Sequence, residues 1–123
     1  MNVNASVPAT SGTMDVDEFM AFLQTRPDEE RWDLIEGVAV MMAPPSVAHQ
    51  RIVQNLCSLL NNAFAARRLD LFAYPGLGVR TEGIKNFQPQ PNVVVIPGIA
   101  SYDLYVEHFQ LAAEVLSSSN TRR

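Results

Sequence analysis

The chain has 123 residues, which is enough for one domain and too few for two. Its 47% hydrophobic and 18% charged residues are typical of a soluble globular protein, and no apolar run approaches the roughly 20 residues that span a bilayer. The net charge of −4 disfavours DNA binding, which relies largely on phosphate contacts, but it does not exclude a local basic patch. One cysteine, Cys57, excludes an internal disulfide and favours a reducing, cytoplasmic compartment.

Residues 1–13 predict a disordered N-terminal tail, because they are mostly small and polar and lack the charged start and apolar stretch of a secretory signal. The domain is expected to occupy residues 14–123. Its first element is a helix over residues 15–24, since Asp15 and Glu18 have the spacing of a capping box. The apolar stripe of this helix consists of Phe19, Phe22 and Leu23.

A hairpin is expected next, with residues 32–35 leading into the turn Glu36-Gly37. In the second strand, Val38, Val40 and Met42 alternate with other residues, as in a strand with one apolar face. Prolines 44 and 45 end this strand, because proline cannot donate a hydrogen bond to a sheet.

The longest helix is expected over residues 46–67 with Ser46 as its cap, and it needs a sheet face to lie against. Its apolar residues repeat at intervals of three and four: Ile52, Val53, Leu56, Leu59, Leu60, Ala63 and Phe64. Strands are expected over residues 71–74, 77–80, 93–96 and 111–116, with a loop and local helix over 102–108. The β-branched run 93–96 is typical of a strand that is covered on both faces.

Glu114 is the most informative polar residue, because it lies inside the apolar strand expected at 111–116. A carboxylate buried there needs a partner or a metal ion. The alternative is an edge strand whose Glu114 points to water. Asn92 stands at the start of the 93–96 strand, where a carboxylate could hold Mg²⁺ through oxygen. The local alternative for Asn92 is an ordinary turn residue.

Three further residues are weaker candidates. Asp33 and Glu36 flank the hairpin turn, and the pattern does not decide between a site role and a structural role. His49 lies in the first turn of the long helix, where the helix dipole disfavours a charged imidazole. It is either a neutral hydrogen-bonding residue beside a site or a structural contact.

Taken in order, these segments resemble the Uma-type family of restriction-endonuclease-like proteins within the PD-(D/E)XK nuclease superfamily. The matching segments are Asp-Val-Asp-Glu-Phe at 15–19, Trp-Asp-Leu-Ile-Glu-Gly at 32–37, Met-Ala-Pro-Pro-Ser at 42–46 with His49, Gln-Pro-Asn-Val-Val-Val at 90–95, and Ala-Glu-Val-Leu-Ser at 113–117. Their number and order make the resemblance much more specific than any one segment.

The resemblance implies an α+β fold, with a mixed sheet flanked by helices, and a Mg²⁺- or Mn²⁺-dependent endonuclease acting on DNA. It implies that Glu114 is a metal-binding carboxylate and that Asn92 occupies a position that is usually aspartate. Either Glu36 or Asp33 would complete the metal site, and His49 would support it. In the family the metal polarises a phosphodiester oxygen and activates a water molecule, with a lysine assisting.

Two departures from the family pattern predict weak or absent cleavage. The first is Asn92, which contributes no charge. The second is the C-terminal part of the pattern: the family continues beyond the 113–117 segment into a lysine-bearing segment and another strand. This sequence ends at Arg123, and its only lysine is Lys85. The fold is therefore expected to be incomplete at its C-terminus. The alternative is a non-catalytic DNA-binding or self-associating domain, for which the edge of the 111–116 strand favours a homodimer. A third option is a protein partner bound along the long helix.

Overall fold

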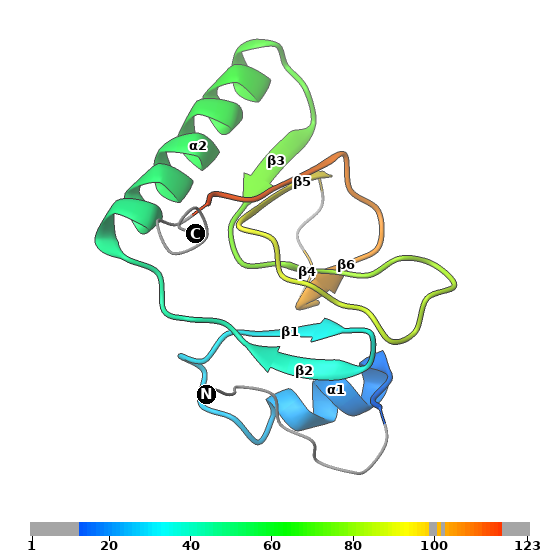
Figure 1. Ribbon diagram of the computed structural model, residues 1–123. Helices are drawn as coiled ribbons and strands as arrows, with labels where there is room; N and C mark the ends of the chain where they lie inside the picture. Colours follow the sequence, from blue (N-terminus) through cyan, green and yellow to red (C-terminus); the bar gives the residue numbers. More distant parts are fainter. Residues whose placement is uncertain (1–12, 99–100, 102, 117–123) are drawn as a thin grey trace. The chain divides into compact units, whose positions relative to one another are not determined.

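The computed structural model describes residues 13–98, 101 and 103–116. The tail expected at residues 1–13 lies outside this part of the chain, except for Thr13. The described residues divide into two compact units (Figure 1). The first unit contains residues of Met1–Pro44 together with Val79–Gln90, and the second contains residues of Pro45–Gly78 together with Pro91–Arg123.

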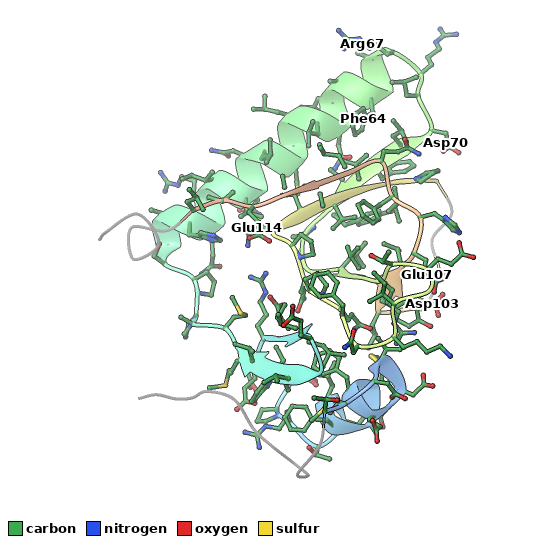
Figure 2. All side chains as sticks on the ribbon, turned by 45° about the vertical axis from the view of Figure 1, so that its right-hand side comes forward. Phe64, Arg67, Asp70, Asp103, Glu107 and Glu114 are labelled. Carbon is green, nitrogen blue, oxygen red and sulfur yellow. The ribbon has the colours of Figure 1, made fainter. Side chains whose placement is uncertain are left out.

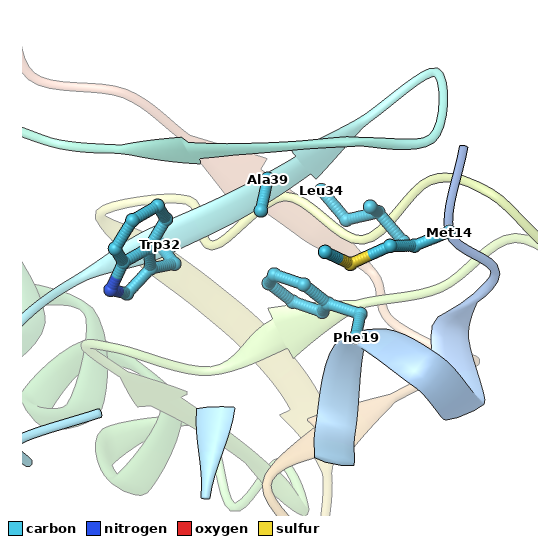
Figure 3. Packing of buried hydrophobic residues seen from close by; sticks show 5 residues of the cluster. All are labelled: Met14, Phe19, Trp32, Leu34 and Ala39. Carbon is cyan, nitrogen blue, oxygen red and sulfur yellow. The ribbon is translucent and has the colours of Figure 1, made fainter. Parts of the chain in front are cut away.

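The first unit is built from one helix and a hairpin: α1 (Val16–Leu23), β1 (Trp32–Ile35) and β2 (Val38–Met41). The expected capping box is present, because the Asp15 carboxylate accepts from the backbone N–H of Glu18 and the Glu18 carboxylate accepts from that of Asp15, each at 2.9 Å. The helix packs its apolar side on the hairpin. Figure 3 shows the resulting core, which consists of Met14, Phe19, Trp32, Leu34 and Ala39.

The hairpin has the predicted strands and turn, but the buried face of its second strand differs from the expected one. The antiparallel register pairs Ala39 with Leu34, so the two residues share the face that packs on α1. Val38 and Met42 are exposed, and Val40 is half-buried. The prediction that these three form the apolar side is therefore wrong. The small side chain of Ala39 leaves space for the buried ring of Phe19, and a larger side chain at position 39 would fill that space.

Residues 79–90 return to the hairpin and complete the first unit. Leu34 and Gln88 exchange two backbone hydrogen bonds, of 3.0 and 2.8 Å, and form an isolated antiparallel bridge. The backbone N–H of Gly37 donates to the carbonyl of Asn86 at 2.8 Å. These bonds fix the segment that ends at Gln90, two residues before Asn92 in the chain.

In the second unit, α2 (Val47–Ala66) packs on a three-stranded antiparallel sheet. Its strands are β3 (Leu71–Tyr74), β5 (Val93–Pro97) and β7 (Leu111–Ala113), in the order β3-β5-β7. Figure 1 shows α2 lying along β3. A separate two-stranded sheet pairs β4 (Gly78–Val79) with β6 (Tyr105–Val106). The strands expected at 77–80 and 111–116 are thus shorter than predicted. In place of the local helix expected within 102–108, the described residues of this range contain the short strand β6; Tyr102 lies outside the described residues.

The core of this second unit lies between α2 and the sheet. Its buried members are Cys57, Ala73, Val93 and Val95, surrounded by Val53, Leu56, Leu60, Phe64, Leu71 and Ala113. All three valines that begin β5 are buried, which confirms the prediction of a strand covered on both faces. Two helices with several antiparallel sheets confirm the α+β class. Within the described part of the chain, no helix is long and apolar enough to cross a membrane.

Candidate functional site

Two of the residues proposed from sequence, Asn92 and His49, bind the backbone of Val115 in the second unit, and a third, Glu114, precedes Val115 in the chain. The side-chain oxygen of Asn92 accepts a hydrogen bond from the backbone N–H of Val115 at 2.7 Å. The ring Nε2 of His49 lies 2.9 Å from the backbone carbonyl oxygen of the same residue. Asn92 immediately precedes β5, His49 is in the first turn of α2, and Glu114 immediately precedes Val115. We call this arrangement of Asn92, His49 and Val115 the Val115 bracket.

Asn92 is almost fully buried, with 7% of its surface exposed. Its side-chain oxygen is the atom that could coordinate a metal ion, and it is already engaged by Val115. Asn92 stands immediately before β5, where the turn interpretation places it. Its side chain also extends the β5–β7 pairing by one hydrogen bond beyond the last backbone pair, Val93 with Ala113.

His49 is placed by the start of α2. The Ser46 hydroxyl accepts from the backbone N–H of His49 at 3.0 Å and caps the helix as predicted. A carbonyl oxygen only accepts, so the contact with Val115 requires a proton on Nε2 of His49. The second ring nitrogen, Nδ1, is buried and has no hydrogen-bond partner among the described residues. The geometry therefore assigns His49 the role of a hydrogen-bond donor.

Glu114 does not lie inside a strand, because β7 ends at Ala113. The ladder stops there since the next inward-pointing N–H, that of Val115, meets the Asn92 side chain instead of a backbone carbonyl. The side chain of Glu114 is exposed, which fits the interpretation of an edge strand with the carboxylate in water (Figure 2). The expectation of a carboxylate enclosed by an apolar strand is wrong for this reason.

The two acidic candidates of the hairpin belong to the first unit. Asp33 is half-buried, and its carboxylate accepts from the backbone N–H of Gln90 at 3.0 Å. The guanidinium of Arg31 donates to the carbonyl oxygen of the same Gln90. Glu36 is exposed at the turn with a φ of 49°. Within its unit, Asp33 is thus a backbone-holding residue and Glu36 is a turn residue.

The candidate metal site is defined by the oxygen ligands that it can offer a divalent cation. Mg²⁺ prefers several oxygen ligands, of which one or two are carboxylates. In the described part of the chain, no three side chains of His, Cys, Asp or Glu lie close enough together to hold a metal ion. Next to Val115 the second unit offers the carboxylate of Glu114 and the amide oxygen of Asn92, which already accepts one hydrogen bond. These donors do not fit a tightly held metal ion.

Sequence reasoning missed the two peptides around which the candidates gather, Val115 and Gln90. Each is held at both its N–H and its carbonyl oxygen by side chains that lie far away in the sequence. Because the contribution of Val115 and Gln90 to these contacts is entirely backbone, no side-chain pattern signals it. The one available signal is proximity, since Gln90 lies two residues before Asn92 and Val115 lies one residue after Glu114.

Comparison with known proteins matched the chain to a family model. The Uma2 model, whose description is "Putative restriction endonuclease", matches residues 16–123 and so covers most of the chain. No curated protein and no solved structure matched significantly.

Proposed function

Because the chain belongs to the Uma2 family of restriction-endonuclease-like proteins, we propose that it is a nuclease-fold domain with DNA as its ligand, and that its hydrolytic activity is weak or absent. The family gives the ligand class, and a phosphodiester bond in DNA is the corresponding substrate. The family also implies Mg²⁺ or Mn²⁺ as cofactor. The metal positions that we propose are Glu114, Asn92 and Glu36, with His49 in support.

The state of Asn92 is the observation that carries the proposal of weak activity. An amide adds no charge to a metal site, and the amide oxygen here already accepts from Val115 at 2.7 Å. The side chain is also buried, so it has little freedom to turn toward a second partner. The hydrogen bond uses one of the two lone pairs of this oxygen and so leaves at most one for a cation.

The expected loss of rate is large. Charge stabilisation by a catalytic metal is worth several kcal/mol of transition-state energy. Since about 1.4 kcal/mol corresponds to a tenfold change in rate, losing even part of this stabilisation lowers cleavage by orders of magnitude. Glu114 remains as one exposed carboxylate, which can bind a cation only weakly by itself.

A plasmid-nicking assay tests the proposal directly. Purified protein is incubated with supercoiled plasmid in Mg²⁺, in Mn²⁺ and in EDTA, and relaxed circles are quantified. We expect the unmodified chain to give no more relaxed product in metal than in EDTA. Asn92→Asp is expected to raise metal-dependent nicking slightly above that background, because it supplies a charge while keeping an oxygen for Val115. The rate should stay low, because the variant still has Lys85 as its only lysine, outside the lysine-bearing segment of the family pattern.

The matched control is the double variant Asn92→Asp with Glu114→Gln, which keeps the new aspartate and removes the remaining carboxylate. It should return to the EDTA background. Strong Mg²⁺-dependent nicking by the unmodified chain that Glu114→Gln abolishes would contradict the proposed loss of activity. Glu36→Gln and Asp33→Asn in the Asn92→Asp background decide which hairpin acid contributes, since only the contributing one should reduce the restored nicking.

A second candidate function is a non-catalytic domain that binds DNA or associates with a second copy. The specific observation in its favour is the edge strand β7, where Leu111 is 47% exposed and Ala112 is also exposed. Exposed strand edges pair readily with other strands. Light scattering across a concentration series tests self-association, and a mass that stays monomeric at the highest concentration would exclude a homodimer. Fluorescence anisotropy with labelled DNA in metal-free buffer, at several salt concentrations, tests whether the domain binds DNA.

A further inference from the structure

We propose that His49 and Asn92 are positioning residues that fix Glu114 through the peptide of Val115, so that hydrogen bonds order this segment without a metal ion. The inference rests on the proposed function for the meaning of Glu114 as a site residue. It goes beyond that function by assigning how the segment is held and by assigning His49 a role other than ligand or base.

The first step is the position of Glu114 between two fixed points. On one side, Ala113 pairs with Val93 in the β5–β7 ladder. On the other side, Val115 is held at its N–H by Asn92 and at its carbonyl oxygen by His49. Both backbone neighbours of Glu114 are therefore fixed, while its side chain is exposed. This arrangement orders the backbone of Glu114 and leaves its carboxylate open to a ligand.

The second step concerns charge. A carboxylate at position 92 would be a buried charge, which burial disfavours unless a cation or another partner compensates it. Asparagine at position 92 carries no charge, and its side-chain oxygen accepts from the N–H of Val115 at 2.7 Å. The segment can therefore hold its geometry in the absence of any cation. A bound metal ion and the Val115 bracket are alternative means of ordering the same stretch of chain.

The third step concerns His49. Its Nε2–H is used by the carbonyl of Val115, and its Nδ1 is buried. A general base needs a free ring nitrogen within reach of water or substrate, and neither nitrogen of His49 offers this. The Ser46 cap fixes the backbone of His49, so the ring extends from a rigid helix start toward Val115. Its contribution to the site is therefore made through Val115.

Amide hydrogen exchange of the full chain, followed by NMR in EDTA, tests the inference. Val115 is expected to be protected in the unmodified chain, and addition of Mg²⁺ should leave its protection unchanged. His49→Phe should lower protection of Val115 by about fivefold more than that of Val94 in the centre of the sheet, as expected for loss of a net hydrogen bond of about 1 kcal/mol. His49→Gln should restore most of it, because a glutamine amide can still donate to the carbonyl.

Val53→Ala is the matched control, because Val53 packs in the core from the same helix and takes no part in the bracket. It should lower protection of Val94 and Val115 equally. The tautomer of His49, read from its ring ¹⁵N shifts in the unmodified chain, gives a measurement that needs no variant. The proton is expected on Nε2.

Three results would overturn the inference: Val115 protected only after Mg²⁺ is added, His49→Phe behaving like Val53→Ala, or the His49 proton found on Nδ1 alone. The nicking assay fails independently of these results. If the unmodified chain nicks strongly in Mg²⁺ and Glu114→Gln abolishes this nicking while Val115 is protected in EDTA, the proposed loss of activity fails and the bracket stands.

Discussion

Asn92 and Val115 are joined by a 2.7 Å hydrogen bond between a side-chain oxygen and a backbone N–H, which closes the β5–β7 ladder where its backbone pairing stops. The bond gives position 92 a structural role that is separate from any metal. Both asparagine and aspartate can accept this hydrogen bond, whereas only aspartate adds a charge. The two roles of the position can therefore be separated by substitution.

Substitutions at Asn92 should separate stability from cation binding. Asn92→Ala leaves the N–H of Val115 without its acceptor and is expected to lower the free energy of unfolding by about 1 to 3 kcal/mol. Asn92→Asp keeps the acceptor and introduces a buried charge, so its stability should rise with Mg²⁺ concentration through linkage. Urea denaturation with Mg²⁺ and with EDTA measures both effects. Equal stabilisation of the unmodified chain by Mg²⁺ would show that its site already binds the metal.

Asn61 should be a major stabilising residue of the second unit. Its side-chain oxygen accepts from the N–H of Ala73 at 2.8 Å, and its amide nitrogen donates to the carbonyl of Ala73 at 3.2 Å. Ala73 is buried, so Asn61→Leu strands a donor and an acceptor and is expected to lower the free energy of unfolding by about 2 to 4 kcal/mol. The control is the exposed neighbour Asn62, whose substitution by alanine should change stability by less than about 0.5 kcal/mol. Similar urea midpoints for the two variants would contradict the assignment.

The hairpin turn of the first unit should respond in opposite directions to two substitutions. Glu36 and Gly37 both have positive φ, of 49° and 84°, as in a type I′ turn. Glu36→Asn is expected to stabilise the unit by some tenths of a kcal/mol, because asparagine tolerates this conformation better. Gly37→Ala should destabilise it by more than about 1 kcal/mol, because the added Cβ would lie 2.4 Å from Cβ of Thr13. Thermal melts of the two variants measure the difference, and a stabilising Gly37→Ala would contradict this geometry.

The elements that sequence predicted well are those fixed by local chemistry. The Asp15–Glu18 capping box, the Ser46 cap and the Glu36-Gly37 turn each depend on residues within a few positions of one another. The valine run of β5 was also predicted, because burial on both faces requires an unbroken apolar stretch. Local spacing carries all of this information.

The elements that sequence missed depend on long-range partners. The buried face of β2 is set by Ala39, which packs against α1, and hydrophobicity alone favoured Val38 and Val40. The early end of β7 depends on Asn92, which replaces the next backbone acceptor. The contact between His49 and Val115 spans 66 positions and uses a backbone carbonyl that no side-chain pattern reveals. The family resemblance located these residues without indicating what they contact.

The first unit should lose a small stabilising contribution in acid. The guanidinium of Arg26 donates two hydrogen bonds, of 2.8 and 2.9 Å, to the carboxylate of Glu30, and the indole N–H of Trp32 donates a third at 3.0 Å. These contacts, chiefly that with Arg26, lower the pKa of Glu30. A carboxylate whose pKa is lowered by folding stabilises the fold above its unfolded pKa, and this contribution disappears as the pH falls through the folded value.

Trp32 is the only tryptophan, so its fluorescence reports directly on this cluster. A change in urea midpoint between neutral and acidic pH is expected for the unmodified chain. The change should be smaller for Glu30→Gln, which removes the titrating group and keeps a similar shape. If both proteins show the same pH dependence, the contacts of Glu30 contribute nothing measurable to acid sensitivity.

Cys57 should be protected from thiol reagents by the packing of α2 on the sheet. The residue is buried among the core of the second unit, and this burial raises the pKa of its thiol. Because the thiolate is the reactive form, both effects slow its reaction. As Cys57 is the only cysteine, the absorbance released by a disulfide reagent measures this one group. The rate should be low in buffer and should rise with urea in parallel with unfolding.

The matched control moves the thiol one position along the helix in the double variant Cys57→Ala, Ser58→Cys, where the exposed site should react at the rate of a free thiol. Equal rates for the two proteins in buffer would show that the helix does not pack its Cys57 side on the sheet in solution.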